Sequence, residues 1–231
     1  MKHYWIKPEN VGRMVESLRK GDHFGFDVET GGLSPLTAEL RLMQFSPDAE
    51  RAFLIDCRDF PSLSENEALR PVRELLEDPW IRKIGHNLKF DAKFVKHHLG
   101  CDIVGIFDTM LGSKIEACGN PAVQHNLAAA MERFLGVEVD KTEQRSDWTV
   151  DVLSENQVAY AAKDVCMLHE LETAIINRLL KLDLMGVANL ENSIVMAMAQ
   201  VELNGFLLDA PMWRQQLRSV EGQAKKAASE L

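Results

Sequence analysis

The chain has 231 residues, of which 46% are apolar and 26% charged, and its formal net charge is −9. This length allows one substantial core, and the composition is that of an ordinary globular domain. The opening residues contain no secretory apolar region and no stretch is long enough to span a bilayer, so we expect a cytoplasmic or other intracellular protein without a membrane partner. The net charge argues against strong nonspecific duplex binding, but it does not exclude a nucleic-acid enzyme, because bound metal would neutralise several acids.

Alternating or continuous apolar runs predict five strands, and the short turns between the first three predict an antiparallel start to the sheet. The predicted strands cover residues 23–30, 40–46, 52–56, 81–87 and 103–107. Helical spacing predicts further elements at 64–76, 88–99, 110–118, 124–135, 154–180 and 188–204. The fold class is therefore α/β, with a mixed five-stranded sheet flanked by helices and a C-terminal helical extension.

The first motif, F-D-V-E-T-G-G-L at residues 26–33, ends the first predicted strand. Asp27 and Glu29 are two residues apart, so their side chains point to the same face of the strand. Two like charges on a half-buried strand are unfavourable without a cation. A lone D-x-E at a strand end is more often solvent-facing, but the adjoining T-G-G-L favours a functional interpretation.

Two further motifs contain acids in helical segments: G-H-N-L-K-F-D at residues 85–91 and Y-A-A-K-D at residues 160–164. Asp91 alone could be an ordinary first-turn acid that complements the helix dipole. Tyr160 and Asp164 are four residues apart and share one helix face. Asp164 has apolar neighbours, where burial of an acid requires a positive partner, although an exposed acid is the simpler alternative.

Together the motifs predict a site for two divalent cations. Four carboxylates gathered at one end of the sheet would suit Mg²⁺ or Mn²⁺, which prefer oxygen ligands. In such a site the ions lie about 3.5–4 Å apart, one activating water and the other stabilising the leaving oxygen. Tyr160 would orient the water, because a phenol with its pKa near 10 is a poor base. The sequence therefore predicts phosphodiester hydrolysis.

The three motifs resemble those of the DEDD superfamily of 3′–5′ exonucleases, in the subtype with tyrosine in the third motif. This group includes the proofreading domain of family A DNA polymerases and RNase D-type enzymes, and the resemblance covers about residues 1–180. It implies a ribonuclease H-like fold and a catalytic group of five residues. These are Asp27, Glu29, Asp91, Tyr160 and Asp164, and the four acids among them are the implied metal ligands.

The resemblance also implies contacts with the substrate strand. Thr30 and Leu33 would meet the terminal nucleotide, with Leu33 as an apolar wedge against the last base. Asn87 and Gln44 are further expected contacts with the strand. Gln144, Arg145 and Trp148 lie in a stretch that would close over the site, with a structural role for Trp148 as the alternative.

The resemblance divides the chain into an exonuclease domain at residues 1–185 and a helical extension at 186–231, similar to the start of a family A polymerase thumb. It implies hydrolysis of single-stranded or frayed DNA 3′ ends with release of nucleoside 5′-monophosphates, and a polymerase domain or partner polymerase. Because no palm motif follows, we expect either a part of a polymerase or a free-standing exonuclease. Two alternatives remain: an RNase D-like enzyme acting on RNA 3′ ends, and a noncatalytic nucleic-acid-binding module.

Overall fold

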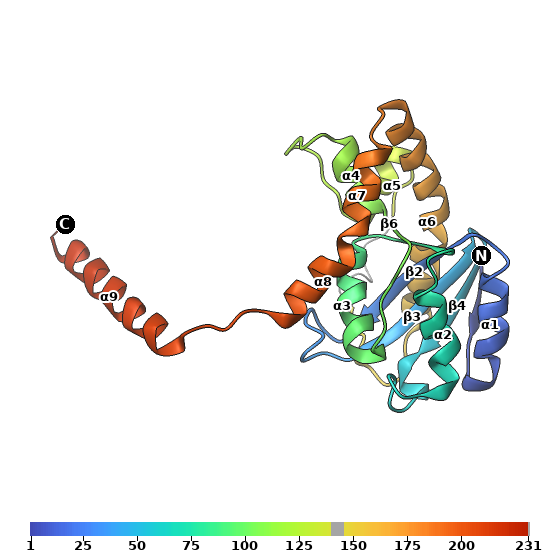
Figure 1. Cartoon of the computed structure of the whole chain (residues 1–231), viewed down its shortest axis with the longest axis horizontal. Helices are drawn as coiled ribbons and strands as arrows, with labels where there is room; N and C mark the ends of the chain where they lie inside the picture. Colours follow the sequence, from blue (N-terminus) through green and yellow to red (C-terminus); the bar gives the residue numbers. More distant parts are fainter. Residues whose placement is uncertain (140–145, 231) are drawn as a thin grey trace. The chain divides into compact units, whose positions relative to one another are not determined.

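The computed structural model describes residues 1–139 and 146–230 of the chain, which form a mixed α/β fold (Figure 1). Six strands make the sheet: β1 (Lys2–Trp5), β2 (His23–Thr30), β3 (Leu40–Asp48), β4 (Arg51–Asp56), β5 (Arg82–Gly85) and β6 (Ile106–Asp108). The helices of the same residues are α1 (Val11–Leu18), α2 (Arg70–Leu76), α3 (Leu88–Leu99), α4 (Thr109–Glu116), α5 (Leu127–Leu135), α6 (Glu155–Lys181), α7 (Met185–Ser193), α8 (Val195–Asn204) and α9 (Ala210–Ser229).

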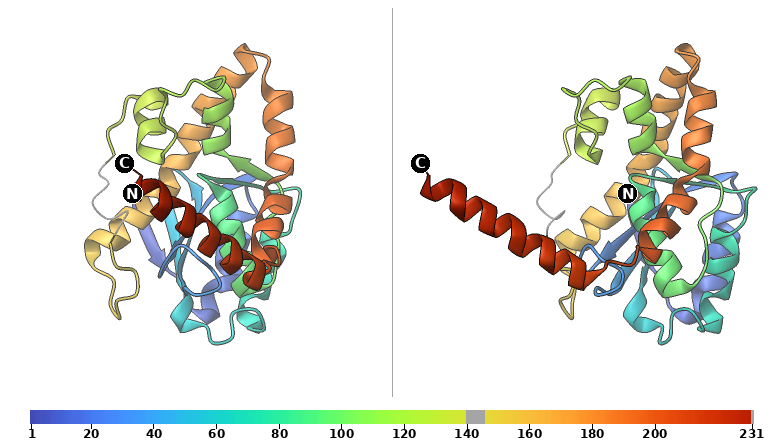
Figure 2. Two further views of the ribbon diagram at one scale, coloured as in Figure 1. Left: turned by 90° about the vertical axis from the view of Figure 1, so that its left-hand side faces the viewer. Right: turned by 60° about the vertical axis from the view of Figure 1, so that its left-hand side comes forward.

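The sheet has the strand order β1-β4-β3-β2-β5-β6. The pairs β2–β3 and β3–β4 are antiparallel, which confirms the predicted start, and the other three pairs are parallel. Helix α6 crosses one face of the sheet and contacts all strands from β1 to β5, while α1 and α3 contact the opposite face (Figure 2). A separate apolar cluster fills each of these two layers.

Several predicted boundaries differ from the structure. The sheet has six strands instead of five because β1 also pairs, parallel to β4, although all four of its side chains are exposed and give no alternating pattern. The helix expected at 64–76 begins at Arg70, after a 3₁₀ turn capped by Asn66. Gly105, with φ +73°, delays the strand expected at 103–107 until Ile106.

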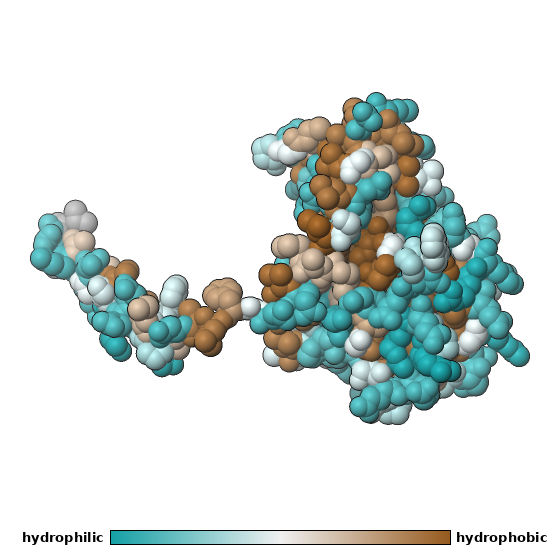
Figure 3. All heavy atoms as spheres, viewed as in Figure 1, coloured by the Kyte–Doolittle hydropathy of each residue, from teal (hydrophilic) through white to brown (hydrophobic). Residues whose placement is uncertain are grey.

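The boundary between the compact unit and the C-terminal unit lies later in the chain than residue 185. The compact unit runs to Gln200, and Val201–Leu231 forms a second unit. The predicted helix at 188–204 is two helices, and α7 belongs to the compact unit because it packs on α4, α6 and β6. In the second unit, α9 has no buried residue, and apolar side chains remain exposed along it (Figure 3). Among the described residues, no helix has the length and apolar character needed to cross a membrane.

Helix α6 approaches the sheet closely at Gly25 in β2. A Cβ atom built on Gly25 would lie 2.5 Å from the carbonyl oxygen of Val165, a distance that real contacts do not show. Since Val165 follows Asp164 and Gly25 precedes Asp27 by two residues, this contact sets the distance between two motifs that are far apart in the sequence.

We therefore expect Gly25→Ala to push α6 away from β2 and to lower the free energy of unfolding by about 1–3 kcal/mol, the usual cost of overpacking. Gly12→Ala in α1 is the matched control, since nothing lies within 4 Å of a Cβ atom there and alanine favours a helix. Urea denaturation of both variants measures the difference. Equal stability of the two variants would contradict this account of Gly25.

Candidate active site

Strand β2 presents two acids to the layer that contains α6. Phe24, Phe26 and Val28 belong to the apolar cluster on the opposite face of the sheet, so the alternate residues point toward α6. Asp27 and Glu29 are among these alternate residues. The first motif thus directs both carboxylates away from the core of α1 and α3.

Asp91 comes from α3 and is fixed to β2 by a direct hydrogen bond. Its Oδ1 atom accepts from the backbone N–H of Val28 at 3.0 Å, so the acid lies between Asp27 and Glu29 along the chain of β2. Asp27 and Asp91 line the same cavity, and the charge of Asp91 helps to raise the pKa of Asp27.

The start of α3 is held by a buried acid that the sequence predictions did not include. Asp108 accepts hydrogen bonds from the backbone N–H groups of Asn87 (2.9 Å) and Leu88 (2.8 Å), and it also caps α4. Its own N–H donates to the side chain of Asn192 in α7. Asn87 adopts a left-handed conformation, φ 68°, which asparagine tolerates better than most residues. Asp108 thereby orients the turn from which Asp91 follows.

Helix α6 contributes the third motif. Ser154 and Gln157 form a capping box at its start, and the Gln157 side chain also donates to the carbonyl of Asp147 at 2.9 Å. Tyr160 and Asp164 share one face of the helix and line the same cavity, where the charge of Asp164 acts on the Tyr160 hydroxyl. The Oδ1 atom of Asp164 is buried without a hydrogen-bond partner.

The three motifs converge on one cavity of about 290 Å³. It is lined by Asp27, Val28, Glu29, His86, Asn87, Phe90, Asp91, Met110, Asn126, Leu127, Tyr160 and Asp164. A second cavity of about 490 Å³ shares Val28, Glu29, Asn87 and Phe90 with the first, so the two are adjacent. Thr30, Leu33 and Trp148 line the second cavity.

The structure buries Gln44 and Trp148, two residues that the resemblance assigned to contact with the substrate strand or to a segment closing over the site. Gln44 is completely buried, so it is unable to touch a substrate strand, and that expectation is corrected. Trp148 lines the second cavity but is 4% exposed and packs in the core beneath α6, in keeping with the structural alternative. Gln144 and Arg145 lie outside the described residues.

Phe90, His86 and Asn126 are cavity residues without a predicted role. The sequence did offer a signal for Phe90, which directly precedes Asp91 in the second motif. His86 reaches across to the carbonyl of His125 through Nε2 at 2.9 Å, and burial lowers its pKa to about 4. A neutral His86 therefore holds the segment that precedes Asn126. No local pattern indicates this long-range contact.

The acids of the site are electrostatically unfavourable because they face one another, and the charge of Lys163 offsets only part of the effect of burial on Asp164. Burial, followed by the charges of Asp91, Glu29 and Asp164, raises the pKa of Asp27 well above its usual range. Burial and the charges of Asp164 and Asp91 do the same for the pKa of Glu29. Burial raises the pKa of Asp91 to about 8 and that of Asp164 to about 6. The acids are thus disposed to bind protons or cations.

The donor set fits hard divalent cations. Four carboxylates, one with an unpartnered buried oxygen, provide the oxygen ligands that such ions prefer. Among the described residues, no group of three or more acidic, histidine or cysteine side chains has a geometry that could hold a metal ion as it stands. Unneutralised carboxylates repel one another, so we expect the final ligand geometry to depend on the charge of the ion.

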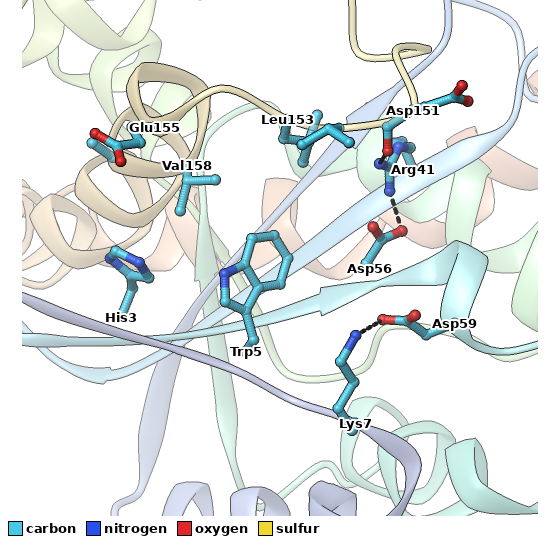
Figure 4. A pocket seen from close by; sticks show the side chains of 12 residues that line it. His3, Trp5, Lys7, Arg41, Asp56, Asp59, Asp151, Leu153, Glu155 and Val158 are labelled. Atoms are coloured by element: carbon cyan, nitrogen blue, oxygen red, sulfur yellow. Dashed lines mark hydrogen bonds and ion pairs between the residues drawn. The ribbon is translucent and has the colours of Figure 1, made fainter.

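A larger cavity of about 770 Å³ lies beside β1 and the start of α6, with Trp5 in its wall (Figure 4). Its charged groups are largely paired, since Lys7 bonds to Asp59 and Arg41 to Asp56. None of the four motif acids lines it. The candidate active site is therefore the smaller cavity.

The fold and the site together define a class: a ribonuclease H-like nuclease with a carboxylate site between β2, α3 and α6. The family model described as 3′–5′ exonuclease matches residues 5–180. The chain belongs to this 3′–5′ exonuclease family, which is part of the DEDD superfamily. Enzymes of this family use divalent metal ions.

Two curated relatives differ in the nucleic acid that their names indicate. The chain is 30% identical to DNA polymerase I of Aquifex aeolicus over 245 residues, covering 98% of this chain and 39% of the polymerase. It is 29% identical to ribonuclease D of Gluconacetobacter diazotrophicus over 171 residues, covering 74% of this chain and 41% of that protein. The chain thus spans about two fifths of the length of both relatives.

Among solved structures, NrnC of Brucella melitensis matches with a TM-score of 0.75 and 27% identity. The match covers 89% of this chain and 95% of NrnC. NrnC has also been solved with bound Mg²⁺ and bound to pGG.

The raised pKa values predict a pH-dependent response to metal. In the metal-free protein these acids hold protons more tightly in the folded state than in the unfolded state. The free energy of unfolding therefore falls as the pH rises from about 4, through the folded pKa values of about 6 for Asp164 and about 8 for Asp91. Metal competes for the same carboxylates, so Mg²⁺ should raise the melting temperature more at about pH 9 than at about pH 5.

Differential scanning fluorimetry with MgCl₂ or with EDTA measures this difference. Asp27→Asn is the control variant, because it removes one of the mutually repelling acids and should reduce the metal-induced rise at high pH. An equal rise at both pH values in the wild type would count against metal binding by these acids.

Proposed function

We propose that the protein removes nucleotides from the 3′ ends of single-stranded or frayed DNA and releases nucleoside 5′-monophosphates. The observation that carries this proposal is the convergence of Asp27, Glu29, Asp91, Tyr160 and Asp164 on one cavity. These residues come from three distant segments, and no shared structural task requires four acids to line one cavity.

The proposed cofactors are two divalent cations, Mg²⁺ or Mn²⁺, held by Asp27, Glu29, Asp91 and Asp164. When bound, such ions activate water and stabilise the charge on the leaving oxygen. The carboxylates themselves would fix the positions of the ions and of the terminal phosphate. The Mg²⁺-bound structure of NrnC supports this choice of metal.

Tyr160 would orient the attacking water by hydrogen bonding. Burial, together with the negative charge of Asp164, raises the pKa of its hydroxyl far above the usual value. The phenol therefore keeps its proton at neutral pH and is a hydrogen-bond donor instead of a base. Its position beside Asp164 places this donor at the edge of the carboxylate group.

The second cavity would bind the terminal nucleotide. Leu33 is 86% exposed at its wall, which suits an apolar wedge against the last base. Thr30 and Asn87 add polar groups, and Phe90, which lines both cavities, adds an aromatic ring on which a base can stack. This arrangement orders the substrate: the base in the second cavity and the scissile phosphate in the first.

DNA is the proposed substrate because the match with DNA polymerase I spans 98% of the chain, including most of residues 186–231. The match with ribonuclease D spans 74%. We propose that residues 186–231 are a thumb-like extension. The match with DNA polymerase I also supports a polymerase domain or partner polymerase as the neighbour of this extension. RNA 3′ ends are the second candidate, supported by the match with ribonuclease D. A noncatalytic binding module is less well supported, since all four acids are present.

Replacement of Tyr160 by phenylalanine tests the water-orienting role. Loss of the hydroxyl should lower kcat about 10²–10³-fold, the scale of one lost transition-state hydrogen bond, while the Mn²⁺ affinity is retained. Single-turnover hydrolysis and Mn²⁺ titration measure the two quantities. The chain has two tyrosines, so Tyr4→Phe in β1 is a natural control with expected wild-type rates. Normal turnover by Tyr160→Phe would exclude the role.

The substrate assignment is tested with 3′- and 5′-labelled single-stranded DNA and RNA of one sequence, in Mg²⁺, Mn²⁺ or EDTA. We expect metal-dependent shortening from the 3′ end, faster on DNA, and none by Asp27→Asn. Faster loss of RNA would establish the second candidate instead. Metal-independent binding without cleavage would indicate the noncatalytic module.

A further inference from the structure

Gln44 in β3 is a buried polar side chain that no interaction in the described residues explains. It has no exposed surface, and both its Nε2 and Oε1 atoms lack hydrogen-bond partners. A buried amide without partners is destabilising because it has lost its hydrogen bonds to water. An apolar side chain at this position would avoid that loss.

The register of the sheet places Gln44 beside the catalytic acids. Gln44 is the direct antiparallel partner of Asp27, so the two side chains lie on the same face of the sheet, the face that α6 covers. Cβ atoms of such pairs are about 4.5–5.5 Å apart, within reach of one side-chain hydrogen bond. The partner of Gln44 on its other side is Leu54 in β4, which offers no polar atom.

We propose that Gln44 is a positioning residue whose Nε2 amide donates a hydrogen bond to the Asp27 carboxylate in the metal-loaded enzyme. This inference rests on the proposed function. In the metal-free state the amide has no partner. A carboxylate that holds a metal ion is an anion and accepts hydrogen bonds, and Gln44, opposite Asp27 in the sheet, provides a donor without adding charge.

Hydrogen bonds of this kind orient a ligand side chain and tune its affinity, and their removal typically weakens metal binding about 10–100-fold. The amide is the favourable group here because a second acid opposite Asp27 would add repulsion to a site that already contains four. A direct contact of Gln44 with the substrate strand is excluded by its burial.

The test compares wild type with Gln44→Met, which keeps the length of the side chain and removes the amide. Mn²⁺ affinity is measured by calorimetry, metal-free stability by thermal melting, and kcat and KM with a labelled oligonucleotide at limiting and saturating Mn²⁺. We expect about a 10-fold rise in the Kd for Mn²⁺. The metal-free melting temperature should stay equal or rise, because an unpartnered amide is removed. At limiting Mn²⁺ the variant should hydrolyse the oligonucleotide more slowly than the wild type. At saturating Mn²⁺ its kcat should return to the wild-type value, and KM should stay unchanged.

Ser46→Ala is the matched control. Ser46 is fully buried in the same strand two residues away, and its hydroxyl bonds to the carbonyl of Asp48, away from the site. This variant should melt at a lower temperature and bind Mn²⁺ like the wild type.

An unchanged Kd in Gln44→Met would overturn the inference, as would a higher KM with an unchanged Kd, which would mean a contact with the strand. Wild-type protein that binds no Mn²⁺ would overturn the proposed function together with this inference. If the wild type binds Mn²⁺ and Gln44→Met binds it with the same Kd, the inference alone is overturned.

Discussion

The contact between α6 and β2 at Gly25 is the constraint on which the site depends. The absence of a side chain at Gly25 lets the backbone of α6 approach the sheet at Val165. Asp164 then lies in the same cavity as Asp27 and Glu29. The apolar layer between α6 and the sheet, with Leu42, Leu54 and Ala161 among its members, holds the helix at this distance. The packing of the core thus fixes the spacing of the acids.

This packing has an unfavourable electrostatic consequence. Burial raises the pKa values of Asp27, Glu29, Asp91 and Asp164, and the negative charges of the cluster add to the effect at Asp27 and Glu29. A protein selected for stability alone would gain by replacing one of them with an apolar residue. Local destabilisation of this kind is typical of functional sites, where the missing positive charge comes with the ligand.

A layer of supporting polar residues surrounds the cavity and reaches well beyond the three motifs. Asp108 joins the start of α3 to α4, and Asn192 extends this connection to α7. Gln157 ties the segment around Asp147 to α6. Because these bonds hold the turns that present the site, residues distant from the chemistry contribute to its geometry. The helix α7 is therefore part of the exonuclease unit, although the family match ends at residue 180.

The sequence by itself determined the α/β class, the antiparallel start of the sheet and the bounds of β2 and α3, because their periodicity and end signals are local. It also determined the three motifs, and through them the family. The tertiary structure alone decided the rest. Strand β1 forms by pairing with β4 without an apolar pattern of its own. Gln44 resembled a surface contact until the register placed it, fully buried, opposite Asp27. Burial and long-range hydrogen bonds join residues far apart in the chain, and local patterns carry no information about such partners.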